Sequence, residues 1–222
     1  MRNPFSPLYL AALVVLASIL LALIQIEIIS LIFDKMGLSP EQAMLLLLAS
    51  LFGSLINLPV TTIKAEHPEI EIKVNITHSL LRIHMPPFTG KTIIAVNVGG
   101  CLVPLVFSAS LIHRFPLGAW EVLIAITTAS IICYLTSRPI PGIGIGMMPL
   151  TAPIFAAIIA ITIGGEHAAP LAYITGTLGV IIGADLMRMK DISRLGTPIA
   201  SIGGAGTFDG IFLTGIVAVL LT

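Results

Sequence analysis

The sequence predicts an all-α polytopic membrane protein with about seven transmembrane helices, some of them broken, and a short cytoplasmic β-hairpin. Of the 222 residues, 56% are hydrophobic and only 10% are charged, whereas a soluble domain carries about a quarter charged residues. The mean hydropathy is +1.06, and nearly all charged residues fall between apolar runs. Such runs form spanning helices when they reach about 20 mostly apolar residues.

Seven apolar runs meet this length criterion, and together they form one transmembrane domain over residues 1–222. They cover residues 8–33, 41–60, 92–113, 117–137, 147–165, 168–187 and 199–221. The first begins like a signal peptide, but it is too long and lacks a small-residue cleavage site, so we expect a retained helix. The fifth is the weakest, because Pro149 and Pro153 interrupt its start.

Basic residues indicate how the chain is oriented. With seven spans, the N-terminus shares one side with the loops near residues 61–91, 138–146 and 188–198. That side carries nine basic residues, namely Arg2, Lys64, Lys73, Arg82, Lys91, Arg138, Arg188, Lys190 and Arg194. The other side carries only Lys35 and Arg114. Because Lys and Arg concentrate in cytoplasmic loops, we expect a cell-membrane protein with a cytoplasmic N-terminus and an external C-terminus.

The polar segment 61–91 is predicted to be a cytoplasmic hairpin inserted between the second and third spans. Apolar residues from Ile70 to Ile76 alternate with polar ones, a period of two that is typical of an amphipathic strand. The following "SLLRIHM" can pair with it. The histidines of this segment lack metal-ligand spacing, and Cys101 and Cys133 lie within apolar runs. The sequence therefore indicates neither a metal site nor a cofactor.

Glycine and proline interrupt three of the apolar runs. These are "NVGGCLVP" (97–104), "RPIPGIGIGMMPLTAP" (138–153) and "GTPIASIGGAGTFDG" (196–210). Small residues at membrane depth often serve close helix packing. The alternating "PGIGIG" and the compact "GGAG" instead favour unwound backbone, which must be buried in protein or line a watery cavity.

Two aspartates sit in or beside these runs. An ionisable residue inside a bilayer costs at least about 2.5–3.5 kcal/mol at the centre of a helix. Asp185 is expected near the cytoplasmic end of the sixth span. If "SIGGAG" is extended and the last helix begins near Thr207, Asp209 falls in its first turn, where the helix dipole favours an acid. The two carboxyl groups then lie at the same depth and can meet.

A meeting pair predicts a catalytic site. Two carboxyl groups that share one proton can activate a water and protonate a carbonyl oxygen, as in aspartic proteases. The candidate catalytic residues are Asp185 and Asp209. Candidates for substrate binding surround them: Gly183, Gly203, Gly204, Gly206, Thr207, Gly210 and Asn97. A structural alternative pairs Asp185 with Arg188 three residues later and uses Asp209 to cap a broken helix.

The strings "IGADLMRMKDI" and "ASIGGAGTFDGIFLTGI" resemble the signature of the domain of unknown function 1614, an uncharacterised prokaryotic membrane family. "NVGGCLVP" and "PGIGIGMMPLTAP" are also similar to its patterns. A weaker resemblance links Asp185 and Asp209 to the diaspartyl intramembrane proteases, the presenilin-like and prepilin-peptidase group. That group has Gly-x-Gly-Asp at its second aspartate, whereas here Thr207 and Phe208 follow Gly206.

Three functions remain open at the level of the sequence. The first is an intramembrane aspartyl protease that acts on transmembrane peptides, and the hairpin at 61–91 could add a strand to them. The second is a small-solute or ion transporter that binds its substrate at broken helices and Asp209. The third is a non-catalytic membrane scaffold. Membrane lipid is a partner in all three, and the net charge of zero indicates no nucleic acid.

Overall fold

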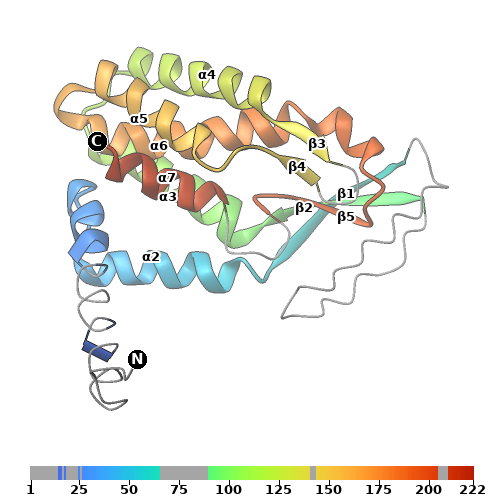
Figure 1. Ribbon diagram of the computed structural model, residues 1–222, viewed down its shortest axis with the longest axis horizontal. Helices are drawn as coiled ribbons and strands as arrows, with labels where there is room; N and C mark the ends of the chain where they lie inside the picture. The colour runs from blue at the N-terminus through green and yellow to red at the C-terminus, as the bar shows by residue number, and fades with distance from the viewer. Residues whose placement is uncertain are drawn as a thin grey trace, which may run out of the picture.

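The computed structural model describes residues 15, 16, 18, 25, 27–65, 90–140, 144–204 and 210–222. This part of the chain is mostly helical, with short strands in two small sheets. Figure 1 shows the strands together at one end of the molecule, while the C-terminus lies at the opposite end of the helices. The helices therefore extend from a small β layer of two sheets, whereas the prediction of an all-α protein included β structure only as a hairpin at 61–91.

Ten helical segments follow the helix Glu27–Lys35 within the described residues. The α-helices are α2 (Pro40–Gly53), α3 (Val103–Arg114), α4 (Ala119–Thr136), α5 (Thr151–Ile163), α6 (Ala168–Val180) and α7 (Gly210–Leu220). Two π-helical segments, η1 (Val98–Leu102) and η3 (Ile181–Leu186), adjoin α3 and α6. Two 3-10 segments, η2 (Gly165–His167) and η4 (Met189–Arg194), occupy connections.

Side chains next to the helix ends explain where several helices begin. Ser39 caps α2: its Oγ accepts a hydrogen bond from the Gln42 amide at 3.3 Å, and its own amide donates to Gln42 Oε1 at 3.2 Å. Glu121 serves the start of α4, because its Oε2 accepts from the Gly118 amide at 3.0 Å. These contacts satisfy backbone amides that have no partner within the helix.

The helices could span a membrane in fewer places than the seven predicted. Within the described residues, Ala119–Thr136 and Gly165–Leu186 are long and apolar enough. The helices Glu27–Lys35 and Pro40–Gly53 meet the criterion only as a pair, bent by 99°. Val98–Arg114, Thr151–Ile163 and Gly210–Leu220 are shorter apolar helices, and most of the first predicted span lies outside the described residues. The count of seven is therefore too high by this criterion.

The shortfall has a physical cause, because three predicted spans contain β-strands. β1 (Asn57–Lys64) begins inside the second, β2 (Lys91–Asn97) opens the third, and β5 (Ile199–Ile202) opens the seventh. A short apolar run that forms a buried strand has the same hydropathy as a piece of helix, so hydropathy alone cannot separate them. The predicted hairpin strands within 66–89 lie outside the described residues, although β1 and β2 flank that segment and pair with each other.

The larger sheet has the strand order β1-β2-β5. β1 runs antiparallel to β2 with a bulge at Val60, and β2 runs parallel to β5. The buried Thr92 hydroxyl donates to the Thr197 carbonyl at 2.7 Å, which fixes the chain as it enters β5. The second sheet is the antiparallel pair β3 (Arg138–Ile140) and β4 (Gly144–Gly146). β5 is thus an edge strand, far in sequence from its neighbour.

α6 lies at the centre of the helical layer, in contact with α3, α4, α5 and α7. Nearly all its side chains are buried, and Tyr173 has no exposed surface. Small residues allow neighbouring helices to approach it closely. A Cβ on Gly179 would lie 2.7 Å from Ala129 Cβ of α4, and one on Gly215 of α7 would lie 2.8 Å from the Tyr173 ring. Glycine packing of this kind is common between helices in membranes.

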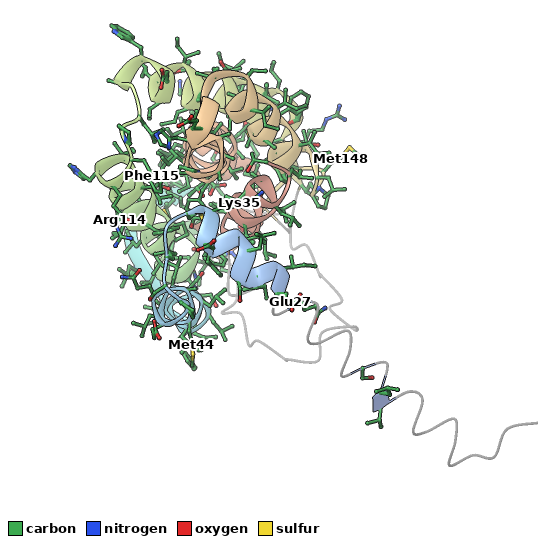
Figure 2. The ribbon with its side chains drawn as sticks, turned by 90° about the vertical axis from the view of Figure 1, so that its left-hand side faces the viewer. Glu27, Lys35, Met44, Arg114, Phe115 and Met148 are labelled. Atoms are coloured by element: carbon green, nitrogen blue, oxygen red, sulfur yellow. The ribbon has the colours of Figure 1, made fainter. Side chains whose placement is uncertain are left out.

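Large apolar side chains cover the outside of the helices. Met148 is 76% exposed, Trp120 75% and Met44 62%. In Figure 2 the labelled Met44 and Met148 lie on the outer surface of the molecule. Met44 lies on α2 and Trp120 on α4, while Met148 lies between β4 and α5. Extensive exposed apolar surface marks a membrane or protein contact.

Candidate functional site

Asp185 lies in the π-helical segment that continues α6. It belongs to η3 (Ile181–Leu186), near the end of the candidate span Gly165–Leu186. The residue is partly buried, and its Oδ2 accepts a hydrogen bond from the Gly203 amide at 3.0 Å. π-Helical turns inside α-helices occur frequently at functional sites, because they redirect side chains.

The backbone that contacts Asp185 is a tight turn at the end of β5. Gly203 and Gly204 have φ angles of +86° and +91°, a region that favours glycine. A Cβ on Gly203 would also lie 2.7 Å from the Gly100 carbonyl carbon and from the Cys101 amide nitrogen. Gly203 is therefore required both by its φ angle and by its close approach to η1. The predicted unwinding is confirmed for residues 199–204, which form a strand and this turn.

A cavity of about 140 Å³ opens beside the Asp185 carboxylate. β5 and β4 border it with Ile199, Ala200, Ser201, Ile202, Gly144 and Ile145. Thr197 also lines it, and the buried Thr197 hydroxyl has no hydrogen-bond partner among the described residues. The cavity is large enough for several waters, since one water needs about 10–15 Å³ of probe-occupied space.

Asn97 was predicted to bind substrate, but its side chain forms hydrogen bonds within the protein. It is 1% exposed, and its Nδ2 donates to the Ser54 carbonyl at 2.7 Å and to Asn57 Oδ1 at 3.0 Å. Its Oδ1 accepts from the Gly100 amide at 2.8 Å and so caps η1. Ser201 of β5 donates to the same Asn57 Oδ1 at 2.6 Å. Asn97 thus joins α2, β1 and η1, and it does not line the cavity beside Asp185.

The other predicted site residues fall into four groups. Gly204 lines the cavity, and Gly203 contacts Asp185. Gly183 is buried against α4, where a Cβ would collide with the Ser130 carbonyl, so its contact serves helix packing. Gly210 begins α7 in open space. Asp209, Gly206 and Thr207 lie outside the described residues.

Arg188 pairs with Asp191 at 3.1 Å, not with Asp185 as the structural alternative expected. Its Nη2 donates to the Tyr134 and Ser137 carbonyls at 2.7 and 2.8 Å, and its guanidinium lies 4.3 Å from the centre of the Tyr134 ring. Arg188 therefore closes the C-terminal end of α4, whose last carbonyls lack partners in the helix.

Sequence reasoning missed the contributions of Thr197, Ser201 and Gly144 to this site. The signal for Gly144 was present, because the alternating "PGIGIG" indicated non-helical backbone, but nothing placed it beside Asp185. Thr197 and Ser201 carry no distinguishing pattern. Within the described residues, no group of three or more His, Cys, Asp or Glu side chains is placed to hold a metal ion.

The fold and the site define a mostly helical protein with helices that could span a membrane, a small β layer at one end, and a carboxylate at a cavity between strands. The chain belongs to the family described as "Protein of unknown function (DUF1614)", whose model matches residues 51–221. No curated protein and no solved structure matches the chain. The first resemblance noted in the sequence is therefore confirmed, and the protease resemblance gains no support from relatives.

Proposed function

We propose that the protein is an intramembrane aspartyl protease in which Asp185 and Asp209 form the catalytic pair. The observation that carries the proposal is the position of the Asp185 carboxylate, at a cavity large enough for water and beside backbone that is not helical. Ionisable residues in spanning segments are rare and usually mark a functional site. Hydrolysis of a peptide bond by this mechanism requires an acid, a water molecule and a substrate whose backbone is not helical. The carboxylate, the cavity and the neighbouring strand correspond to these three requirements.

The chain that leads to Asp209 favours an approach of the two carboxyl groups. After β5, the turn at Gly203 and Gly204 lies beside Asp185, and the described part of α7 begins at Gly210. In the sequence, Asp209 comes immediately before Gly210, the first described residue of α7. An acid at the N-terminus of a helix is stabilised by the helix dipole. A seventh span that was helical from residue 199 would have separated the two acids in depth, and β5 removes that obstacle.

The proposed reaction uses one proton shared by the pair. The ionised carboxylate takes a proton from water, and the water oxygen attacks the peptide carbonyl carbon while the protonated carboxyl group donates to the carbonyl oxygen. The carbon–nitrogen bond then breaks: the nitrogen leaves with a proton from one carboxyl group, and a hydroxyl group of the tetrahedral intermediate returns a proton to the other, so that the pair again holds one proton. Two carboxyl groups in one site hold a single proton readily, because two adjacent negative charges repel each other.

The proposed setting is the cell membrane, with the N-terminus in the cytoplasm and the C-terminus outside. The charge asymmetry of the loops supports this orientation, and the exposed apolar helices support a lipid environment. Asp185, near the end of its span, then faces the cytoplasmic half of the membrane. The substrates are transmembrane peptides that reach the site from the lipid.

The test is a cleavage assay with the full chain in liposomes and a library of single-span reporter helices. The wild type should release soluble fragments, while Asp185→Asn and Asp209→Asn should each lose nearly all activity. Glu166→Gln, which alters an acid in the connection between α5 and α6, serves as the matched control and should retain activity. Full activity in either aspartate variant contradicts the proposal.

A specific observation favours a transporter as the second candidate. Ser108 of α3 and Thr175 and Thr177 of α6 have buried hydroxyl groups with no hydrogen-bond partner among the described residues. Buried polar groups are ordinarily satisfied, so such hydroxyl groups suit a path of water or ions along α6 toward Asp185. Proteoliposome flux that is lost in Asp185→Asn, without cleavage of any reporter, would favour the transporter.

A further inference from the structure

The cavity beside Asp185 borders the edge of β5. Four consecutive residues of β5, Ile199 to Ile202, line it. Side chains of a strand alternate between its two faces, so a cavity over one face would meet every second residue. Contact with all four residues means that the cavity runs along the edge of the strand, where the backbone is reached directly.

Hydrogen-bonding groups of β5 point to that edge. The Ile93 amide donates to the Pro198 carbonyl at 2.9 Å, and Ile93 stands opposite Ile199 in the parallel register. In such a ladder Ile93 bonds to the residues on either side of Ile199, so the amide and carbonyl of Ile199 point away from β2. The same holds for the Ser201 amide, whereas the Ser201 carbonyl accepts from Gly204 at 3.3 Å in the turn.

The opposite side of the cavity is formed by β4. Gly144 and Ile145 line it, and a Cβ placed on Gly144 would meet nothing within 4 Å. The space between β4 and β5 is therefore open next to Gly144. Among the described residues, the larger sheet ends at β5 and β4 pairs with β3 alone. Each strand can therefore accept one more neighbour at the edge that no described strand occupies.

We infer that an extended peptide segment binds in this space by pairing with the edge of β5, so that its backbone passes Asp185. This inference rests on the proposed function and names the form of its substrate: a segment that leaves the helical state and presents alternate amides and carbonyls to Ile199 and Ser201. Main-chain hydrogen bonds supply the affinity in strand addition. The sequence had suggested strand addition at the 61–91 hairpin, most of which lies outside the described residues; the inference here concerns β5.

The first test needs no change in the protein. The probe is a short fluorescent peptide of alternating Val and Thr, together with derivatives N-methylated at one backbone nitrogen at a time, titrated against the full chain in detergent. Pairing with one strand edge predicts a period of two: methylation at every second nitrogen weakens binding by about three- to tenfold, the worth of one hydrogen bond. Methylation at the intervening nitrogens has a smaller effect.

The second test changes the edge itself. Ile199→Pro removes the amide that faces the cavity but keeps the amides that bond to β2, so binding should fall about three- to tenfold. Val60→Pro is the matched control. Val60 also follows a proline, lies on the other edge strand of the sheet, and is the bulged residue without a partner in the register. Thermal unfolding checks that both variants fold. If Ile199→Pro does not fold, the methylation series alone tests the pairing with β5.

The outcomes separate this inference from the proposed protease. If N-methylation weakens binding at every second nitrogen but no reporter is cleaved, the inference is supported and the protease proposal is contradicted. If reporters are cleaved but the methylation effect has no period of two, the protease proposal is supported and the inference is overturned. Absence of peptide binding, or a folded Ile199→Pro that binds as the wild type does, also overturns it. The inference is also overturned if the protein forms a dimer that Ile199→Pro dissociates, because the edge of β5 then binds a second copy of the chain.

Discussion

The Asp185 carboxylate accepts a hydrogen bond from the backbone amide of Gly203, with 3.0 Å between Oδ2 and the nitrogen. The contact joins the π-helical end of α6 to the turn that follows β5, across 18 residues of sequence. It holds an acid beside non-helical backbone and a cavity. The proposed chemistry depends on this junction, so its geometry provides the first prediction.

Gly203→Ala should disrupt the junction. The left-handed backbone at φ +86° costs a residue with a Cβ about 1–2 kcal/mol, and the collision with Gly100 and Cys101 adds about 1–3 kcal/mol of overpacking. Denaturant or thermal unfolding in detergent measures the loss. Gly210→Ala is the control, because its Cβ meets nothing within 4 Å. Equal stability of the two variants would contradict the assigned role of Gly203.

Asn97→Ala should destabilise the fold and leave substrate affinity unchanged in whatever fraction folds. The substitution removes three hydrogen bonds around a buried side chain, and the loss of a cap together with unsatisfied partners amounts to about 2–4 kcal/mol. Unfolding measurements test this. Thr162→Ala on the exposed face of α5 is a suitable control, with an expected change within about 0.5 kcal/mol. If Asn97→Ala instead lowers the substrate affinity without changing the stability, Asn97 contacts the substrate and this prediction is wrong.

Arg188→Lys should loosen the C-terminal end of α4. Lysine cannot reproduce the planar contacts with the Tyr134 and Ser137 carbonyls, the Tyr134 ring and Asp191, since Arg and Lys are not interchangeable at such sites. We expect faster hydrogen exchange of the last-turn amides of α4, by about tenfold or more for a loss of 1.4 kcal/mol. The exposed Lys190, changed to Ala, should leave that exchange unaltered. Unchanged exchange in Arg188→Lys would argue that the cap contributes nothing.

Sequence reasoning succeeded where an apolar run forms a single continuous helix. The predicted spans 117–137 and 168–187 agree closely with Ala119–Thr136 and Gly165–Leu186, since length and hydropathy suffice for such helices. Glycine and proline also located the breaks at Gly144 and Gly203, because few residues tolerate the backbone found there.

The pairing of strands that lie far apart in the sequence could not be predicted from these patterns. β2 and β5 lie about a hundred residues apart, and nothing in "KTIIAVN" or "IASI" says that the two strands pair. Asn97 illustrates the same limit: a polar residue in an apolar run indicated a binding site, but its partners, Ser54 and Asn57, are known only once the fold is. Arg188 was near enough in sequence to Asp185 to suggest an ion pair, yet the end of α4 holds it instead.

The most direct measurement of the central claim is thiol cross-linking between positions 185 and 209. Asp185→Cys and Asp209→Cys are combined after both native cysteines are replaced by alanine, and the membranes are treated with a mild oxidant. A disulfide requires Cα atoms within about 7 Å. The protease account predicts rapid formation of the 185–209 disulfide, at a rate far above that of an Asp185→Cys and Thr222→Cys pair. Two thiols that both react with maleimide but never join, even through a short bifunctional reagent, would contradict it.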